Sequence, residues 1–343
     1  MRRAPIPGDC GPAPLVCENL AMASIMTVLG PVSPDALGPT YMHEHVLVDN
    51  SFSGNNPLKK LDEVDTLIDE MRDVRRAGGR TVVDCTCVGL APDPAGLKRI
   101  AQDADVHLIA CTGFYRACVW PTYVHTSSAE DLAERMIDDC ANGLADTNVR
   151  PGMLAEFSAH EREGDGWVLP AAAGKVFRAA CIAQRETGLP ITTHCGFHRA
   201  DWQIAAFRKG GVALDRVVLA HMVPDADAID AGRGHPVMEH LRRILDTGVN
   251  IGIDAIAYGE RDGKTLAVSD KARLVRTVVE WGHLDQTTVS LDMTRRYHLK
   301  KYGGHGFAFL MDGFTPMLRE VGLSDRQVDH ILVENPKRIL TPG

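Results

Sequence analysis

The chain has 343 residues, of which 45% are hydrophobic and 24% are charged, and its formal net charge is −8. This balance is typical of a globular protein and excludes a disordered or fibrous chain. The modest acidic charge predicts no general attraction to nucleic acid or to a membrane surface, and no apolar run approaches the roughly 18 residues of a membrane span. The nine cysteines follow no regular spacing, which favours reduced thiols and a cytoplasmic location.

The N-terminal segment differs from the rest of the chain. Residues 1–25 are rich in Pro and Gly, show no periodicity and lack the apolar stretch of a secretory signal. We predict that this segment is a disordered arm. Met22 and Met26 are alternative starts to Met1, which would make the arm an upstream extension.

From residue 37 onward, short apolar runs alternate with longer amphipathic segments. The segment 61–79 repeats its apolar residues with a period of about 3.6 and closes on Gly78 and Gly79, which predicts a helix. Further helices are predicted at roughly 93–104, 128–144, 171–188, 200–210, 235–248, 269–282 and 307–321, the first, fourth and last of these with weaker patterns. The predicted strands are 39–49, 81–87, 107–114, 152–159, 191–197, 216–222, 250–256 and 288–293.

Eight alternating strand–helix units predict a parallel sheet with its helices outside. Over about 300 residues they fit a closed (β/α)8 TIM barrel of the α/β class, formed as a single domain by residues 26–343. An open doubly wound sheet is the alternative, but it normally carries a G-x-G-x-x-G loop, and no such motif follows a predicted strand.

Ionisable residues gather toward the C-terminal ends of these strands, where barrel enzymes carry their active sites. In "YMHEHVLVD", His43 and His45 are two residues apart and are expected on one face of the first strand, with Glu44 on the other. Burying six polar groups without hydrogen-bond partners would cost about 1–3 kcal/mol each. The total would be comparable to a typical free energy of unfolding of about 5–15 kcal/mol. Imidazole and carboxylate are natural ligands of a divalent cation, so we predict a metal site. The candidate ligands are His43, His45, Glu156, His194, His221 and Asp292, with Asp84 and Asp254 as weaker candidates behind them.

Six ligands exceed the roughly three that a single catalytic zinc takes from a protein. They fit two ions about 3.5–4 Å apart that share a bridging carboxylate and a bridging hydroxide, whose pKa the two cations lower. Zinc suits these ligands, and manganese, cobalt and iron suit them almost as well. A barrel that binds a metal or a small ligand without turnover is the alternative, although a decayed enzyme is expected to lose a ligand and this set is complete.

Four motifs carry a family resemblance: "GPTYMHEH", "THCGFH", "VVLAHM" and "LDMTRRYHLKKYGGHGFAFL". In this order they resemble the phosphotriesterase family of the amidohydrolase superfamily, from about residue 27 to 340. The resemblance implies that His43, His45 and Asp292 hold the more buried ion, and that His194 and His221 hold the more exposed one.

The bridging position departs from the best-known members of that family. Organophosphate-hydrolysing members bridge the ions with a carboxylated lysine, whereas the strand "LAEFSAH" offers Glu156, as in the branch of phosphotriesterase homology proteins. This difference argues against efficient organophosphate hydrolysis. It also removes any need for carbon dioxide to assemble the site.

The resemblance implies a hydrolase in which the bridging hydroxide attacks the substrate and Asp292 moves a proton toward the leaving group. Tyr115 is expected near the hydroxide, as in related lactonases, or else only packs at the rim. His198 and His305 lie in predicted loops at the barrel mouth and are candidates for substrate contact. We expect the substrate to be a lactone or carboxylic ester with an anionic group. Phosphotriester or phosphodiester hydrolysis and amide hydrolysis are the alternatives.

A basic cluster follows the eighth predicted strand in a chain that is acidic as a whole. It contains Arg295, Arg296, Lys300 and Lys301. Arginine suits planar recognition of carboxylate or phosphate, so we expect Arg295 and Arg296 to bind an anionic small-molecule substrate or product. The alternative is that these arginines brace neighbouring acids such as Asp292. Dimers are common in the family, which leaves a homodimer open.

Overall fold

The computed structural model describes residues 24–52, 56–163, 166–232, 234–259 and 266–343. The predicted N-terminal arm therefore lies almost wholly outside the described residues. Its predicted end is corrected, however, because Ile25 is fully buried and begins strand β1 (Ile25–Thr27), which pairs with β2 (Gly30–Val32).

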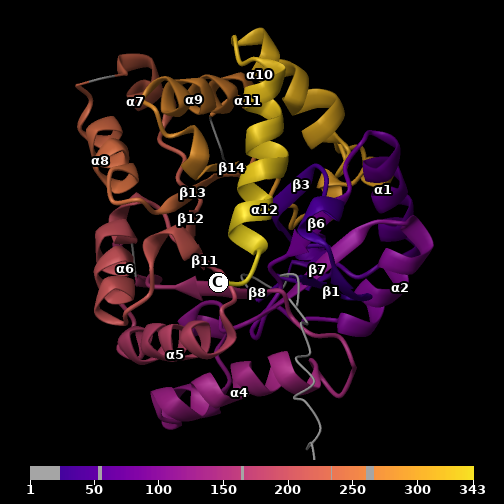
Figure 1. Cartoon of the computed structure of the whole chain (residues 1–343), viewed down its shortest axis with the longest axis vertical. Coiled ribbons are helices and arrows are strands. Elements are labelled where there is room, and N and C mark those ends of the chain that lie inside the picture. The colour runs from indigo at the N-terminus through magenta and orange to yellow at the C-terminus, as the bar shows by residue number, and fades with distance from the viewer. Residues whose placement is uncertain (1–23, 53–55, 164–165, 233, 260–265) are drawn as a thin grey trace, which may run out of the picture.

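Eight parallel strands form one sheet in the order β14-β13-β12-β11-β8-β7-β6-β3. Figure 1 shows helices arranged around these strands, and the predicted (β/α)8 barrel is confirmed. The strands are shorter than predicted at their C-terminal ends, so that His45, His221 and Asp292 fall in the loops that follow. Their bounds are β3 (Thr40–Glu44), β6 (Thr81–Asp84), β7 (His107–Thr112), β8 (Met153–Ser158), β11 (Ile191–His194), β12 (Val217–Ala220), β13 (Asn250–Ile253) and β14 (Thr287–Val289).

The long helices lie close to the predicted segments. The 200–210 segment, whose pattern was weak, is a helix of 13 residues, whereas the 307–321 segment splits into a π-helical turn at Leu310–Phe314 and the short helix α10 (Thr315–Glu320). None of the described helices is long and apolar enough to span a membrane. Besides α10, the described α-helices are α1 (Val64–Arg76), α2 (Pro94–Ala104), α3 (Thr122–Thr126), α4 (Ala129–Asn142), α5 (Ala173–Thr187), α6 (Phe197–Lys209), α7 (Ala226–Ala231), α8 (Pro236–Leu245), α9 (Val268–Glu280), α11 (Asp325–Asp329) and α12 (Asn335–Leu340).

Besides β1–β2, two more strand pairs lie outside the barrel sheet among the described residues, and neither pairing was predicted from the sequence. One joins β4 (Val48–Asp49) to β5 (Lys60–Leu61), after the first barrel strand. The other joins β9 (Glu161–Glu163) to β10 (Gly166–Val168), after β8. Both follow the C-terminal end of a barrel strand, so they lie on the side of the barrel where the candidate ligands gather.

Apolar side chains fill the barrel and close its opposite end. The interior cluster continues into Ile25 of β1 and into Ile339 and Leu340 of α12, the C-terminal helix drawn in yellow in Figure 1. This packing stabilises the N-terminal ends of the strands, whereas the polar candidate ligands lie at the C-terminal ends. The interior residues of this cluster are Met42, Val83, Cys85, Ile109, Cys111, Met153, Ala155 and Val218.

The two end strands of the sheet, β3 and β14, meet without a backbone ladder among their described residues. Side chains join them instead. The Ser290 hydroxyl donates to Glu44 Oε1 at 2.9 Å and accepts from the backbone N–H of His43 at 2.9 Å. The seam of the barrel therefore runs directly beside the first pair of candidate ligands.

Candidate metal centre

The Glu156 side chain lies at the centre of the candidate site, almost fully buried on β8. Its Oε1 atom is 2.9 Å from His194 Nδ1 and 3.3 Å from His221 Nε2. The same Oε1 is 3.3 Å from His43 Nε2, and Oε2 is 3.6 Å from His45 Nε2. One carboxylate thus contacts imidazoles that come from three different parts of the barrel.

Close approach of the neighbouring strands positions Glu156. A Cβ added at Gly113, just after β7, would lie 1.8 Å from the carbonyl oxygen of Ala155, so only glycine fits there. On the same side, the backbone N–H of Glu156 donates to Cys87 Sγ at 3.1 Å. The backbone that carries the central carboxylate is therefore tightly packed on this side.

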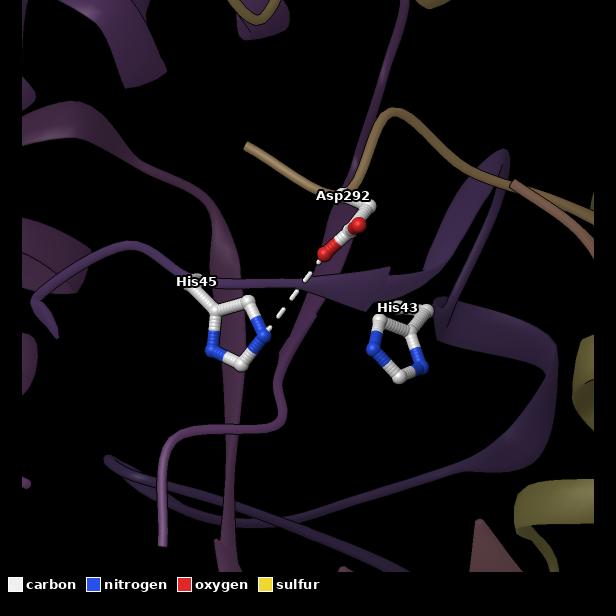
Figure 2. Close-up of side chains that lie close together, drawn as sticks. All are labelled: His43, His45 and Asp292. Carbon is white, nitrogen blue, oxygen red and sulfur yellow. Dashed lines mark ion pairs between the residues drawn. The ribbon is translucent and has the colours of Figure 1, made fainter. Parts of the chain in front are cut away.

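Asp292 completes the group on the side of the two N-terminal histidines. Figure 2 shows it with His43 and His45, and its Oδ1 atom is 3.7 Å from His45 Nε2. One possible ligand atom from each of His43, His45 and Asp292 lies within 4.8 Å of the others, and the same holds for His43, Glu156 and His221. The structure therefore brings all six predicted ligands to one end of the barrel.

A chain of hydrogen bonds orients His45 from behind. Thr86 Oγ1 donates to Asp84 Oδ1 at 3.0 Å, which leaves its oxygen free to accept from His45 Nδ1–H, also at 3.0 Å. With Nδ1 protonated, the Nε2 lone pair of His45 points toward Glu156 and Asp292. Asp84, predicted to stand behind the ligands, does so through Thr86.

The ligand-bearing loops leave their strands through left-handed backbone. His221 has φ of +61° and Asp292 has φ of +56°, and Ala255, next to Asp254, has φ of +54°. Such conformations in residues other than glycine cost about 1–3 kcal/mol each and cluster at functional sites. They lie one to three residues beyond the ends of β12, β13 and β14, within the predicted extent of these strands.

Several buried atoms of this group lack hydrogen-bond partners among the described residues. They include His43 Nδ1, His43 Nε2 and Glu156 Oε2. An unsatisfied buried polar atom costs about 1–3 kcal/mol, and several together are unusual in a native site. A divalent cation would satisfy these atoms, because imidazole nitrogens and carboxylate oxygens are its usual ligands in proteins. The buried side chains of His43 and Glu156 therefore suit a metal site.

The electrostatics favour the cation-binding forms of His45, His194 and Glu156 but not of the other two histidines. Burial lowers the pKa of His45 to about 3 and that of His194 to about 4, so both rings are neutral. Burial opposes ionisation of Glu156, but His43 and His194 outweigh it and hold the pKa of this carboxyl well below its usual range. Burial raises the pKa of Asp292 to about 6. Burial lowers the pKa of His221 and of His43, but Asp254 outweighs it at His221, and Cys85 and Glu156 outweigh it at His43, so that both pKa values lie well above the ordinary value.

A pocket of about 650 Å³ opens above these residues. Three of the predicted substrate-contacting residues line it, namely Tyr115, His198 and Arg295. The Tyr115 ring is buried and stands edge-on to the ring of the candidate ligand His194, with centroids 5.1 Å apart. These three residues are therefore placed where a bound small molecule would contact them.

The other two predicted substrate contacts, Arg296 and His305, lie outside the described lining of this pocket. Arg296 is not among the described residues lining the pocket, because its Nη2 atom binds Asp62 Oδ1 at 2.8 Å. His305 is also outside that lining. Its ring stacks on the Phe309 ring, with the two ring centroids 4.4 Å apart. Lys301 likewise binds Glu63, at 2.6 Å, so most of the predicted basic cluster is neutralised by acids near α1.

Other residues that line the pocket were not predicted from the sequence. Arg116 follows Tyr115 and forms an ion pair with Glu161, and its guanidinium carbon lies 5.8 Å from the Trp167 ring centroid. A basic residue two positions beyond the end of a predicted strand is a signal that could have identified Arg116. Trp167 lies on the β9–β10 hairpin, where nothing in the sequence marked a site. The unpredicted lining residues include Lys59, Arg116, His160, Trp167, Tyr258 and Lys271.

A (β/α)8 barrel with four histidines and two carboxylates at the C-terminal ends of its strands defines a metal-dependent hydrolase. A sequence profile of the phosphotriesterase family matches residues 23–340, and the chain belongs to that family. The phosphotriesterase homology protein of Escherichia coli strain K12 is 32% identical over 310 residues, which cover 90% of this chain and 99% of that protein.

Further comparisons agree with this assignment. A crystal structure of the Escherichia coli phosphotriesterase homology protein, with phosphate in its active site, has a TM-score of 0.79 at 30% identity and covers 89% of this chain and 99% of its own. An N-acetyltaurine hydrolase of Salmo salar is 27% identical over 351 residues, covering 92% of this chain and 97% of that protein. A lactonase of Listeria monocytogenes shares the fold, with a TM-score of 0.79 at 22% identity over 93% of this chain and 99% of its own.

Proposed function

We propose that the chain is a binuclear hydrolase of carbonyl substrates that carry an anionic group. His43, His45 and Asp292 would hold one divalent cation, His194 and His221 the other, and Glu156 would contact both. The observation that carries this proposal is the Glu156 carboxylate, which lies 2.9–3.6 Å from four imidazoles. Divalent cations supply Lewis acidity and activate a water for attack near neutral pH.

The residues around the site suit hydrolysis of an ester or amide bond. Water oxygen bonds to the acyl carbon, the bond to the leaving oxygen or nitrogen breaks, and a proton passes to the leaving group. The Asp292 carboxylate faces the pocket and would carry that proton. The buried Tyr115 hydroxyphenyl group and His198 would position the acyl end beside His194.

Cationic side chains on the pocket wall support an anionic substrate. Arg295 and Lys59 line the pocket together, and burial and the Arg295 charge lower the pKa of Lys59. Arg116 lines it as well, beside Tyr115, although its guanidinium is already paired with Glu161, so Arg295 and Lys59 carry this argument. Positive charge in a partly buried pocket attracts a carboxylate, sulfonate or phosphate group.

A lactone or carboxylic ester is the first candidate, as the sequence predicts. An N-acyl amine is the second, and one observation favours it: N-acetyltaurine hydrolases match this chain over about nine-tenths of its length. Triester hydrolysis is disfavoured, because Glu156 takes the place of the lysine on which organophosphate-hydrolysing members depend. Zinc suits the ligands, with manganese, cobalt or iron as alternatives.

The experiment that tests this proposal measures metal content and then activity on one sample. Purified protein is analysed by elemental mass spectrometry and is then assayed with lactones, carboxylic esters, N-acetyltaurine and neutral phosphotriesters. We expect about two metal ions per chain and turnover of anionic acyl substrates. Turnover of triesters alone would replace the proposed substrate class, and absence of bound metal after supplementation would overturn the metal centre itself.

A further inference from the structure

Glu44 stands between His43 and His45 in the sequence, but its side chain points away from both of them into the barrel seam. It is fully buried. Its Oε1 atom accepts from the backbone N–H of Leu291 at 2.6 Å and from the Ser290 hydroxyl at 2.9 Å, and Oε2 accepts from the backbone N–H of Met293 at 3.0 Å. A single carboxylate therefore binds three donors of the segment that follows β14.

The two backbone donors flank one residue, Asp292. Its φ of +56° is a conformation that residues other than glycine rarely adopt. Glu44 accepts hydrogen bonds from the backbone N–H groups of Leu291 and Met293, so the backbone on both sides of Asp292 is fixed. The Asp292 carboxylate then faces His45, with Oδ1 at 3.7 Å from Nε2.

The hydrogen bonds of Glu44 cross the seam where the barrel closes between β3 and β14. No backbone ladder joins β3 and β14 among their described residues, so side chains must set the distance between the two strands. Ser290 extends the contact, since its hydroxyl also accepts from the backbone N–H of His43 at 2.9 Å. The segments that carry His43, His45 and Asp292 are thus connected through Glu44 and Ser290.

We propose that Glu44 is a positioning residue that holds Asp292 at the correct distance from His43 and His45; this inference rests on the metal centre of the proposed function. A carboxylate is required because two backbone N–H groups each need an acceptor oxygen. Glutamine would turn an NH2 group toward one of them, and aspartate is one methylene too short to reach both. Residues that hydrogen-bond to metal ligands, or to the backbone that carries them, commonly tune the affinity and geometry of metal sites in proteins.

The test compares Glu44→Gln with a matched control elsewhere in the fold. Glu70 on α1 is also buried and also accepts from two backbone N–H groups, those of Lys300 at 2.7 Å and Phe307 at 2.9 Å. Its contacts do not involve a candidate ligand. Both variants are examined by amide hydrogen exchange of the metal-free protein, by thermal melting, and by titration with Co²⁺ followed through its visible absorption bands.

We expect Glu44→Gln to speed exchange about tenfold in peptides covering 288–295 and to weaken Co²⁺ binding about tenfold or more, with altered absorption bands. Glu70→Gln is expected to speed exchange at 298–308 and to leave Co²⁺ binding and its spectrum unchanged. Unchanged exchange at 288–295, or equal Co²⁺ affinity in wild type and Glu44→Gln, would overturn the inference. Equal loss of Co²⁺ affinity in both variants would also overturn it, because that result reflects general destabilisation.

Two further results separate this inference from the proposed function. If wild-type protein binds no Co²⁺, the metal centre fails, while the exchange data still decide whether Glu44 fixes the segment around Asp292. If Glu44→Gln does not fold, Glu44→Asp replaces it, and the same regional pattern of exchange and Co²⁺ binding is required of that variant.

Discussion

Asp254 contacts His221 at two points. Its Oδ1 atom is 2.7 Å from His221 Nδ1, and its Oδ2 atom accepts from the backbone N–H of His221 at 2.9 Å. Asp254 is fully buried. The carboxylate fixes the proton on Nδ1, so the Nε2 lone pair points toward Glu156 Oε1, 3.3 Å away. The structure thus places Asp254 behind a candidate ligand, as predicted for a weaker site residue.

Replacing Asp254 with asparagine should therefore weaken the metal centre without removing a ligand. The amide can accept only one of the two bonds from His221, and its NH2 group opposes the other. We expect metal affinity and kcat/KM to fall about 10–100-fold. Chelator competition gives the affinity, and initial rates on the best substrate of the screen give kcat/KM.

The control for this variant is Asp201→Asn. Asp201 also contacts a histidine, with Oδ2 3.0 Å from His240 Nε2, but this carboxylate is 80% exposed. Exposed pairs of this kind contribute about 0–1 kcal/mol, so neither metal affinity nor activity should change. Wild-type metal affinity in Asp254→Asn would show that the orientation of His221 does not depend on Asp254.

The barrel and its candidate ligands could be predicted because both leave local marks in the sequence. Apolar strands alternating with amphipathic helices predict the fold, and ionisable residues such as Glu156 and His194 stand out within those apolar runs. The order of strands in a barrel brings their C-terminal ends together. The convergence of residues distant in sequence therefore followed from the fold class alone.

The substrate-facing residues were harder to predict because their direction depends on distant partners. Arg295 lines the pocket, whereas the next residue, Arg296, turns to Asp62, which lies 234 positions away in the sequence. Nothing in "TRRYH" distinguishes the two arginines. Similarly, Trp167 reaches the pocket only because the β9–β10 hairpin folds over it, and Glu44 reaches Leu291 only because the barrel closes at that seam.

A second prediction concerns the central carboxylate. Glu156→Gln keeps the size of the side chain but removes the negative charge that faces four imidazoles. We expect metal content to fall to about one ion per chain or less, and kcat to fall roughly 100-fold, equivalent to about 2.7 kcal/mol. Elemental analysis and steady-state kinetics measure the two effects. Retention of full metal content by this variant would exclude Glu156 as a shared ligand.

A third prediction uses the two neighbouring arginines as a matched pair. Arg295 lines the pocket, and Arg296 binds Asp62 outside it. We expect Arg295→Gln to raise KM for an anionic substrate about tenfold, the effect of losing about 1.4 kcal/mol of charge-assisted binding, and to leave KM for a neutral analogue unchanged. Arg296→Gln should alter neither value, because a partly exposed ion pair contributes about 0–1 kcal/mol to stability only. Equal effects of both substitutions would indicate that the charge of the whole loop, rather than Arg295, attracts the substrate.

The last prediction concerns pH and the Glu70 carboxyl that holds the segment 300–307. Burial raises the pKa of Glu70 above its ordinary value of 4.5. Between 4.5 and the raised pKa the folded chain binds more protons than the unfolded chain, so the free energy of unfolding falls as pH rises through this window. Glu70→Gln cannot titrate. The free energy of unfolding of wild type minus that of the variant should therefore be largest below about pH 4.5 and should decrease as pH rises through the raised pKa of Glu70, as measured by urea denaturation. Other titrating groups cancel in this difference because both proteins contain them, so a difference that increases with pH would mean that hydrogen bonds from Lys300 and Phe307 outweigh burial.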